Sequence, residues 1–407
     1  MKALIRLYLN SYKGLSPAAW LLALVMLINR AGSMVIPFLG IYMSSELNFS
    51  KPQIGIVLGC FGLGSVCGSW LGGLLTDKFG SFKVQAFSLA MVIPLFLILP
   101  QFRTFEGLAT MIFTLSVVAD IFRPANSVSV ARYAKPENIT KAYSLNRMAV
   151  NLGFSIGPAL GGFLAKFSYD WIFYGNAIAA ASALIVFILF FRNRKARTEV
   201  NQINISAEED KDKPVRNAYA DGKFIVFNIL CCLFSMAFFQ LLSTLPLFYK
   251  EIHGLHADQI GLLLGFSGFV IVLFEMVLVH VVEHRFSVRQ IMLWGTAIAA
   301  FSYLMLTVDF GIAWLFLAMF FLSTGEMLTL PFTATVAIGR ASRSNQGAYM
   351  GFNSLAFAAA NIFSPYLGTY TAEHYGYTTL WTITAILMGL CSIGFYWIIT
   401  KMDREPS

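Results

Sequence analysis

Apolar runs of about 20 residues recur along the whole chain, and they restrict its possible folds more than any other feature. Lipid offers no partner for backbone N–H and C=O groups, so a segment that crosses it must be a helix or part of a closed barrel. Barrel strands would alternate apolar and polar residues, and these runs do not. Only 12% of the residues are charged, against about 25% in a soluble domain. We therefore expect an all-α polytopic membrane protein.

Twelve spans are predicted from these runs, and the first, near Pro17, is too long to be a cleaved signal segment. The predicted spans are 18–43, 53–76, 82–100, 105–129, 139–165, 171–191, 224–249, 258–281, 288–308, 311–336, 347–370 and 378–400.

The distribution of Lys and Arg predicts that both termini are cytoplasmic. In that orientation the outward loops hold Lys51, Arg103, Lys166 and Lys250, and most of the 29 basic residues face the cytoplasm. The net charge of +8 then reflects topology and anionic lipid, so no nucleic-acid partner is expected. The expected location is a plasma membrane, in particular a bacterial inner membrane.

A polar, charged segment divides the spans into two sets of six. We interpret residues 192–222 as a cytoplasmic linker, flexible apart from an optional short amphipathic helix. The predicted domains are thus an N-terminal six-helix bundle, 1–191, and a C-terminal six-helix bundle, 223–407.

The two halves resemble each other around their fourth and fifth spans. Each has an acid, a proline soon after it, a basic loop, an Ala-Tyr pair and a later proline. The matched pairs are Asp120 with Glu326, Pro124 with Pro331, Ala142-Tyr143 with Ala348-Tyr349, and Pro158 with Pro365. Two six-span repeats are typical of one large class of secondary transporters.

The loop between the second and third spans carries a recognisable motif. It is similar to the G-x-x-x-D-[R/K]-x-G signature of major facilitator superfamily transporters, and departs from it where Ser81 and Phe82 replace basic residues. The matching positions, with one nearby basic residue, are Gly73, Asp77, Lys78, Gly80 and Lys83. The resemblance extends over the full chain and implies two pseudo-symmetric six-helix bundles, a small-molecule substrate, no cofactor and a monomer. It also implies that Asp77 contacts span 11 as a gating latch; the alternative is a simple positive-inside turn.

The fifth predicted span resembles the family's G-x-x-x-G-P-x-x-G-G motif. The matching residues are Gly153, Gly157, Pro158, Gly161 and Gly162. In the family this motif is characteristic of antiporters, drug:proton exporters above all. The alternative is a close helix contact with no further role, since small residues at every fourth position also serve that purpose.

Ionisable residues within spans are costly and mark functional sites. The six are Arg30, Asp120, Arg123, Arg147, Glu275 and Glu326. We expect Arg30 to face a cavity, where it meets a carboxylate or an anionic part of a substrate. A static ion pair with Asp120 is the alternative. Arg147 is expected to anchor the membrane interface.

Asp120 and Arg123 lie one turn apart and share a helix face. The resemblance relates Arg123 to a basic motif linked to proton transfer, and a local Asp–Arg pair is the alternative. A buried carboxyl group that can lose and regain a proton would couple transport to a proton gradient. Glu326 is the favoured coupling residue, followed by Asp120 and Glu275. For Glu275, an ion pair near the cytoplasmic end or a lipid-facing position remains open.

Polar residues in the spans are candidates to line a substrate cavity with Arg30 and Arg123. They are Asn126, Gln240, Asn353 and Asn361. The 38 Phe and 16 Met residues suit bulky apolar substrates. The five Cys lie in apolar spans, and neither they nor the His residues have the spacing of a metal site.

Four functions were compared. We favour a proton-coupled exporter of amphipathic or drug-like molecules. A proton symporter for a peptide, sugar or organic anion is the alternative, and a lipid flippase with the same fold is not separated from export by sequence. A membrane enzyme or sensor is disfavoured because no catalytic motif is visible.

Overall fold

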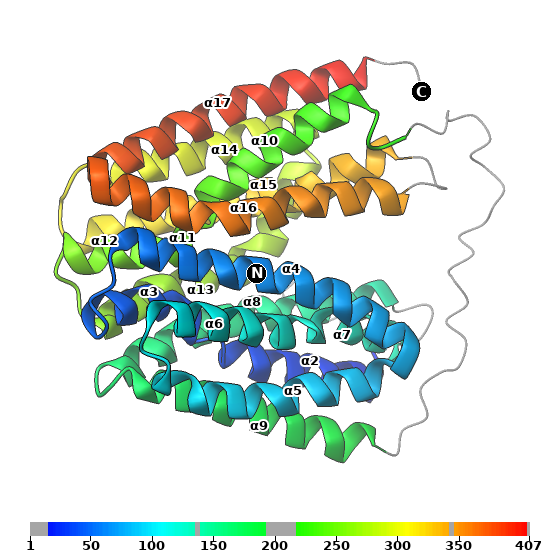
Figure 1. Ribbon diagram of the computed structural model, residues 1–407. Coiled ribbons are helices and arrows are strands. Elements are labelled where there is room, and N and C mark those ends of the chain that lie inside the picture. Colours follow the sequence, from blue (N-terminus) through cyan, green and yellow to red (C-terminus); the bar gives the residue numbers. More distant parts are fainter. Residues whose placement is uncertain (1–14, 135–138, 193–216, 342–345, 405–407) are drawn as a thin grey trace, which may run out of the picture. The chain divides into compact units, whose positions relative to one another are not determined.

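The computed structural model describes residues 15–134, 139–192, 217–341 and 346–404. Within these ranges every regular element is a helix, which confirms the all-α prediction (Figure 1). Most of the predicted linker, 193–216, lies outside them. Backbone contacts divide the chain into two compact units. Unit 1 comprises Met1–Phe38 and Cys60–Asn204, and unit 2 comprises Leu39–Gly59 and Ile205–Ser407. The domain boundaries predicted from sequence stay a prediction.

The helices of unit 1 follow one another in short steps. They are α2 (Pro17–Ala31), the beginning of α3 (Val35–Ser45), most of α4 (Lys51–Phe79), α5 (Ser81–Ile98), the 3₁₀ turn η1 (Leu99–Gln101), α6 (Phe105–Asp120), α7 (Phe122–Tyr133), α8 (Ile139–Ala165) and α9 (Asp170–Phe191). Helix α2 packs against α8 and α9, and α5 lies beside α9 (Figure 1).

Unit 2 contains the remaining helices. They are α10 (Gly222–Phe238), α11 (Gln240–Ser243), α12 (Leu245–Glu251), α13 (Ala257–Glu283), α14 (Val288–Met305), α15 (Ile312–Arg340), α16 (Gln346–Tyr375) and α17 (Tyr377–Asp403). Helix α14 packs against α15 and α17, and α10 packs against α16 and α17.

Ten helical segments of the described chain are long and apolar enough to cross a membrane. They correspond to ten of the twelve predicted spans. The other two predicted spans, 288–308 and 347–370, lie on α14 and α16, which carry more polar residues. Many apolar side chains point outward: Leu189 on α9 is 74% exposed and Leu390 on α17 is 63% exposed. Such faces suit lipid, and the multi-pass membrane prediction is confirmed.

Aromatic side chains fill the core of unit 2. The ring of Trp381 is stacked 5.7 Å from Tyr303 and meets Phe248 edge-on at 5.3 Å. The Tyr303 hydroxyl donates to the backbone oxygen of Ala237 at 2.7 Å, so this buried polar group has a partner. These rings therefore pack into an apolar core, in which the Trp381 Nε1 is buried without a hydrogen-bond partner in the described part of the chain.

An ion-pair cluster ties the start of α4 to other helices of unit 2. The Lys51 ammonium lies 2.9 Å from Glu251 and 3.7 Å from Glu373. The Tyr377 hydroxyl donates to the same Glu251 carboxylate at 3.0 Å. Three helix ends, those of α12, α16 and α17, thus meet the first residue of α4.

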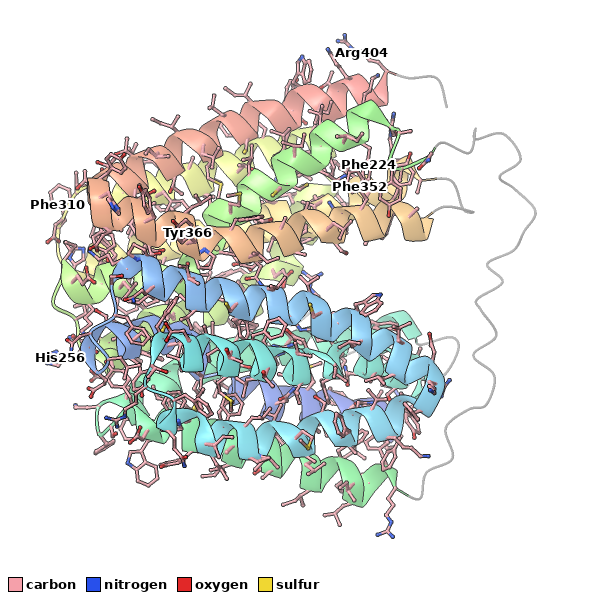
Figure 2. All side chains as sticks on the ribbon, in the orientation of Figure 1. Phe224, His256, Phe310, Phe352, Tyr366 and Arg404 are labelled. Carbon is pink, nitrogen blue, oxygen red and sulfur yellow. The ribbon has the colours of Figure 1, made fainter. Side chains whose placement is uncertain are left out.

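Another cluster fixes the beginning of α10. Asp221 caps this helix by accepting from the Phe224 N–H, and the Arg340 guanidinium binds both carboxylate oxygens at 2.8 and 3.0 Å. The Tyr349 hydroxyl donates to the same carboxylate at 3.0 Å. The Phe224 ring lies 4.5 Å from the ring of Tyr349 and 5.8 Å from that of Phe352, which is beside it in Figure 2.

Candidate functional site

The first span of the chain is interrupted directly after Arg30. Helix α2 ends at Ala31 and α3 begins at Val35. Gly32 lies in the gap, where an added Cβ would be 2.5 Å from the Cβ of Ala179 on α9. Only glycine allows this approach, so the break is pressed against α9 with Arg30 at its edge. Interrupted helices are frequent at the substrate and ion sites of transporters.

The fourth span is interrupted as well, between Asp120 and Arg123. Helix α6 ends at Asp120, Ile121 is a turn residue, and α7 begins at Phe122. Pro124 has no N–H, so it cannot donate to the backbone oxygen of Asp120 four residues earlier. The break at Ile121 therefore lies between an acid, Asp120, and a base, Arg123, which are three positions apart in the chain.

Glycines on α8 pack against the Cβ and backbone of Arg30. A Cβ at Gly153 would collide with the Arg30 Cβ, and a Cβ at Gly157 would lie 3.2 Å from the Arg30 backbone oxygen. One turn further, a Cβ at Gly161 would lie 2.9 Å from the Cβ of Met34. The glycines of the predicted antiporter motif thus form the surface of α8 against which α2 packs. The remaining members of the motif, Pro158 and Gly162, are buried in α8.

A second set of glycines allows α4 to pack closely against the interrupted fourth span. A Cβ at Gly64 would lie 2.5 Å from the Phe113 oxygen, and one at Gly72 would lie 2.6 Å from the Ile121 oxygen and 2.7 Å from Pro124. Gly68, between them, faces Val117 in the same way. Small residues at every fourth position let the two backbones touch, and Gly72 supports the break itself.

Asp120 pairs with Arg123, which is the local pair that the sequence left open. The Arg123 Nε lies 2.6 Å from an Asp120 carboxylate oxygen, and the acid side chain is only 6% exposed whereas the base is 49% exposed. Arg30 makes no ion pair among the residues that the structure describes, and its Nε is buried without a hydrogen-bond partner there. The alternative of a static Arg30–Asp120 pair is thus not what the structure shows.

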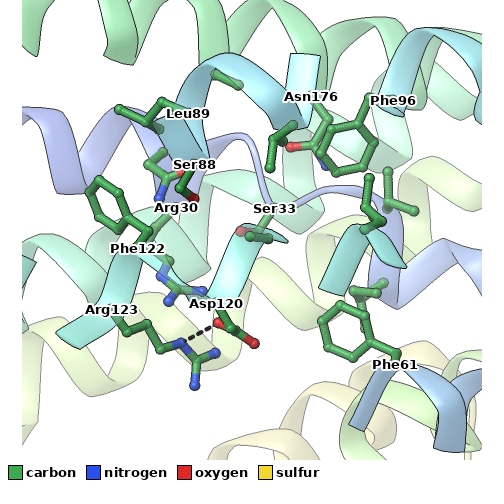
Figure 3. A pocket seen from close by; sticks show the side chains of 17 residues that line it. Arg30, Ser33, Phe61, Ser88, Leu89, Phe96, Asp120, Phe122, Arg123 and Asn176 are labelled. Atoms are coloured by element: carbon green, nitrogen blue, oxygen red, sulfur yellow. Dashed lines mark ion pairs between the residues drawn. The ribbon is translucent and has the colours of Figure 1, made fainter. Parts of the chain in front are cut away.

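The three charged residues line one pocket of unit 1, with a volume of about 80 Å³ (Figure 3). The Arg30 side chain extends toward the Asp120–Arg123 pair. Polar side chains and apolar side chains make up the rest of the wall. The other lining residues are Asn29, Ser33, Val35, Ile36, Phe61, Ser88, Leu89, Val92, Phe96, Leu115, Ala119, Phe122, Asn176 and Ala180.

Four polar members of this wall were missed by sequence reasoning: Asn29, Ser33, Ser88 and Asn176. Asn29 and Ser33 flank Arg30 within an apolar span, and this proximity was the available signal. Asn176 and Ser88 come from α9 and α5, and nothing in one sequence relates those helices to Arg30. The Ser88 hydroxyl is already engaged, since it donates to the Val118 oxygen at 2.7 Å.

Asn126 lies on α7, after the break in the fourth span, and it is not among the residues that line the pocket. Its Nδ2 donates to Asn146 Oδ1 on α8 at 3.1 Å, while its own Oδ1 is buried without a partner in the described chain. This amide links two helices of unit 1, and its predicted place in a substrate cavity stays a prediction.

The other cavity candidates belong to unit 2. Gln240 donates to the backbone oxygen of Ser364 at 2.9 Å and to its hydroxyl at 3.1 Å. Asn353 donates to Asn228 Oδ1 at 3.1 Å. Asn361 is half-buried on α16. The amides of Gln240 and Asn353 therefore join helices of their own unit.

The predicted coupling acids are divided between the units. Asp120 lies in the unit 1 pocket, while Glu275 on α13 and Glu326 on α15 are half-buried residues of unit 2. Gly325 precedes Glu326 where α15 touches α14: an added Cβ would be 2.7 Å from the Gly295 oxygen. Glu326 is thus held next to a close helix contact. Its role as the coupling acid stays a prediction.

The predicted gating motif surrounds the turn between α4 and α5. Gly80 has a φ of +84°, a conformation that L residues rarely adopt, and it separates the two helices. Asp77, Lys78 and Lys83 are exposed, and a Cβ at Gly73 would meet nothing within 4 Å. Glycine is required at the turn, therefore, but not by packing at Gly73. The contact of Asp77 with span 11 stays a prediction.

These features define a polytopic helical membrane protein with a charged pocket beside two broken spans. The sequence profile of the Major Facilitator Superfamily matches residues 19–282 and 229–407, so the chain belongs to this family of membrane transporters. Two similar proteins of Bacillus subtilis are the uncharacterized MFS-type transporter YttB, 27% identical over 92% of both chains, and multidrug resistance protein 1, 24% identical over 82% of this chain and 84% of that one.

Solved structures share the fold at low identity. A POT family transporter in complex with 5-aminolevulinic acid is 16% identical, with a TM-score of 0.79 over 95% of this chain and 96% of that one. The nucleoside transporter NupG is also 16% identical, with a TM-score of 0.78 over 96% of this chain and 100% of the other. The predicted fold of the major facilitator superfamily is therefore confirmed.

Proposed function

We propose that the protein exports amphipathic small molecules in exchange for protons, by alternating access of its two six-helix halves. The observation that carries the proposal is the unit 1 pocket, where Arg30, Asp120 and Arg123 lie beside two interrupted spans. A charged pocket with apolar walls suits amphipathic molecules. Sequence relatives named multidrug resistance proteins, and the glycine motif that seats α2 on α8, favour export.

The remaining parts of the proposal follow from the sequence. The chain acts as a monomer without a cofactor, with both termini in the cytoplasm and the linker at 192–222 between the halves. Glu326 carries the coupling proton, with Asp120 and Glu275 as the next candidates. Each of these acids lies within a span, where a charge that gains or loses a proton changes the cost of burial.

Inside-out vesicles with an acidic lumen test this function. We expect proton efflux from the lumen to drive uptake of an amphipathic dye, followed by rapid filtration. The probes are ethidium, which is a cation, and anilinonaphthalene sulfonate, which is an anion. Glu326→Gln should abolish the uptake, whereas Glu106→Gln, an exposed acid at the start of α6, should not. If neither dye moves with the gradient, the exporter proposal is wrong.

One observation favours a second candidate, symport of an organic anion with protons. The pocket holds more basic than acidic side chains, and related folds were solved with 5-aminolevulinic acid and with sulfate. The same vesicles separate the two functions by direction. A symporter would empty a preloaded acidic lumen of the anion, while an exporter would fill it.

A further inference from the structure

We propose that the unit 1 pocket binds an anionic group, such as a carboxylate on an apolar skeleton, and that Arg30 is the residue that contacts it. This site assigns the transported molecule to the amphipathic organic anions. The inference rests on the proposed function in one respect, which is that the molecule bound in the pocket is taken to be the transported substrate.

The balance of charge in the pocket is the first argument. Two guanidinium groups, from Arg30 and Arg123, face one carboxylate, from Asp120, and no other lining residue of the pocket is ionisable. Arginine keeps its proton under all ordinary conditions. With Asp120 ionised, the side chains that line the pocket therefore carry one uncompensated positive charge.

The second argument is that Asp120, the only acid that lines the pocket, already forms an ion pair with Arg123. Asp120 lies 2.6 Å from the Arg123 Nε. The Arg30 Nε is buried and has no hydrogen-bond partner in the described part of the chain. A buried charged donor without a partner is expensive. A carboxylate presents two oxygens to the planar fork of a guanidinium, so an anionic ligand would satisfy Arg30.

The third argument concerns size and lining. A volume of about 80 Å³ holds roughly five water molecules, which is enough for a carboxylate and a few carbon atoms. Phe61, Phe96 and Leu115 offer apolar surface, while Asn29 and Asn176 offer amide groups. An amphipathic anion matches both kinds of wall, and a cation would be repelled by the excess positive charge.

The fixed position of Arg30 is the fourth argument. The glycines of α8 contact its Cβ and backbone, and the helix ends one residue later. Its backbone is therefore held on two sides while its side chain extends into the pocket (Figure 3). A charge held in advance loses little freedom on binding, which favours affinity.

Three probes with one four-carbon skeleton, which matches the size of the pocket, test the proposal: butanoate, 1-butanol and 1-butylammonium. Binding to the purified full-length protein is measured by calorimetry and by the shift in melting temperature. We expect the carboxylate to bind at least about tenfold more tightly than the alcohol, and the ammonium to bind most weakly. Equal binding of the three probes, or no binding of the carboxylate, would overturn the proposal.

Variants then assign the contact. Arg30→Gln should weaken carboxylate binding by about tenfold or more, because it removes the charged donor. Asp120→Asn should tighten it severalfold, because the competing carboxylate is gone. Arg103→Gln changes the net charge equally at an exposed position outside the pocket and should leave binding unchanged.

Two further results keep the outcome decisive. If Arg30→Gln does not fold, Arg30→Lys retains the charge but not the planar fork, and weaker carboxylate binding with retained preference over the alcohol supports the site. Unchanged affinity in the folded Arg30 variant overturns it. Selective anion binding without gradient-driven transport would contradict the proposed function alone, and proton-driven export with no preference for anions would contradict this inference alone.

Discussion

Helices α2 and α10 are both followed by a break, but the two units treat the break differently. Arg30 lies seven residues before Pro37, and Phe239 lies seven residues before Pro246, so the two occupy matching places. In unit 2 the neighbouring Gln240 fills the break by donating to Ser364. In unit 1 the break carries a cation that lines a pocket. At this break, unit 2 has a hydrogen-bonded amide, that of Gln240, and unit 1 has a charged side chain, that of Arg30.

The fourth span of each half repeats this difference. Asp120 is followed by Arg123 and Pro124 at a real break, whereas Pro331 lies inside the continuous helix α15 and the two residues before it are Thr329 and Leu330. Both halves keep an acid, but only unit 1 adds the cations. The comparison teaches that a shared repeat can carry a charged pocket at a helix break in one unit and a continuous, closely packed helix in the other.

At the starts of the helices the difference is reversed, because here unit 2 carries the charged residues. Their removal has the largest effect on stability that we predict. Asp221 and Arg340 are 4% and 9% exposed as side chains and form a buried ion pair at the start of α10. Asp221→Ala would remove the buried carboxylate that binds both Arg340 and Tyr349, so we expect a loss of about 3–5 kcal/mol in the free energy of unfolding. Thermal and denaturant melts in detergent measure this loss. The double variant Asp221→Ala with Arg340→Ala should recover part of this loss. If Asp221→Ala alone costs less than about 1 kcal/mol, the pair contributes no more to stability than an exposed salt bridge.

The same pair predicts how stability depends on pH. Burial by itself would raise the pKa of Asp221, but hydrogen bonds from Arg340, Phe224 and Tyr349 outweigh it and hold the pKa below its ordinary value of 3.8. A carboxyl group with a lowered folded-state pKa stabilises the protein above that ordinary value and stops doing so as the pH falls through the lowered one.

Melting curves of the wild type and Asp221→Asn between neutral and strongly acidic pH check this sign. The advantage of the wild type should be constant near neutrality and shrink below about pH 4. The effect should be smaller than that of Asp221→Ala, because Asn and a protonated Asp both keep hydrogen-bonding groups. An advantage that grows on acidification would reverse the assignment.

Glycine packing gives an intermediate effect that is specific to unit 1. Gly153→Ala brings a Cβ against the Arg30 Cβ and within 3.0 Å of the Ala31 nitrogen, and overpacking of this kind costs about 1–3 kcal/mol. Because α2 carries Arg30, binding of butanoate should weaken as well. On α16, Gly351 has nothing within 4 Å, so Gly351→Ala should be neutral or slightly stabilising. Equal melting temperatures for the two variants would show that α8 and α2 can separate without cost.

Sequence reasoning reached the fold and the charged residues but not the pocket. The apolar runs were enough for the helices, and the repeat together with the motifs at Gly73–Gly80 and Gly153–Gly162 carried the resemblance to the family. Arg30, Asp120 and Arg123 stood out because charge in a span is costly. Asn176 and Ser88 could not be found, since their place depends on how α9 and α5 pack around α2. Gln240 and Asn353 bond to neighbouring helices, and their place in a cavity stays a prediction, because a polar residue in a span gives the same sequence signal whether it faces a ligand or a helix.

The start of α2 offers the smallest test, matched to that of α10. Ser16 caps α2 by accepting from the Ala19 N–H at 3.1 Å, and its hydroxyl donates to the Tyr133 oxygen at the end of α7 at 2.8 Å. It joins the first and fourth spans, as Asp221 does through Arg340, but without charge. Ser16→Ala should therefore cost about 1 kcal/mol, the usual value for a lost cap, and the loss should not depend on pH because no ionisable group is involved. Melts of Ser16→Ala and Asp221→Ala at the same two pH values make the comparison. A loss at Ser16 as large as that at Asp221 would show that the connection between the two helices, and not the buried charge, determines the stability of both starts.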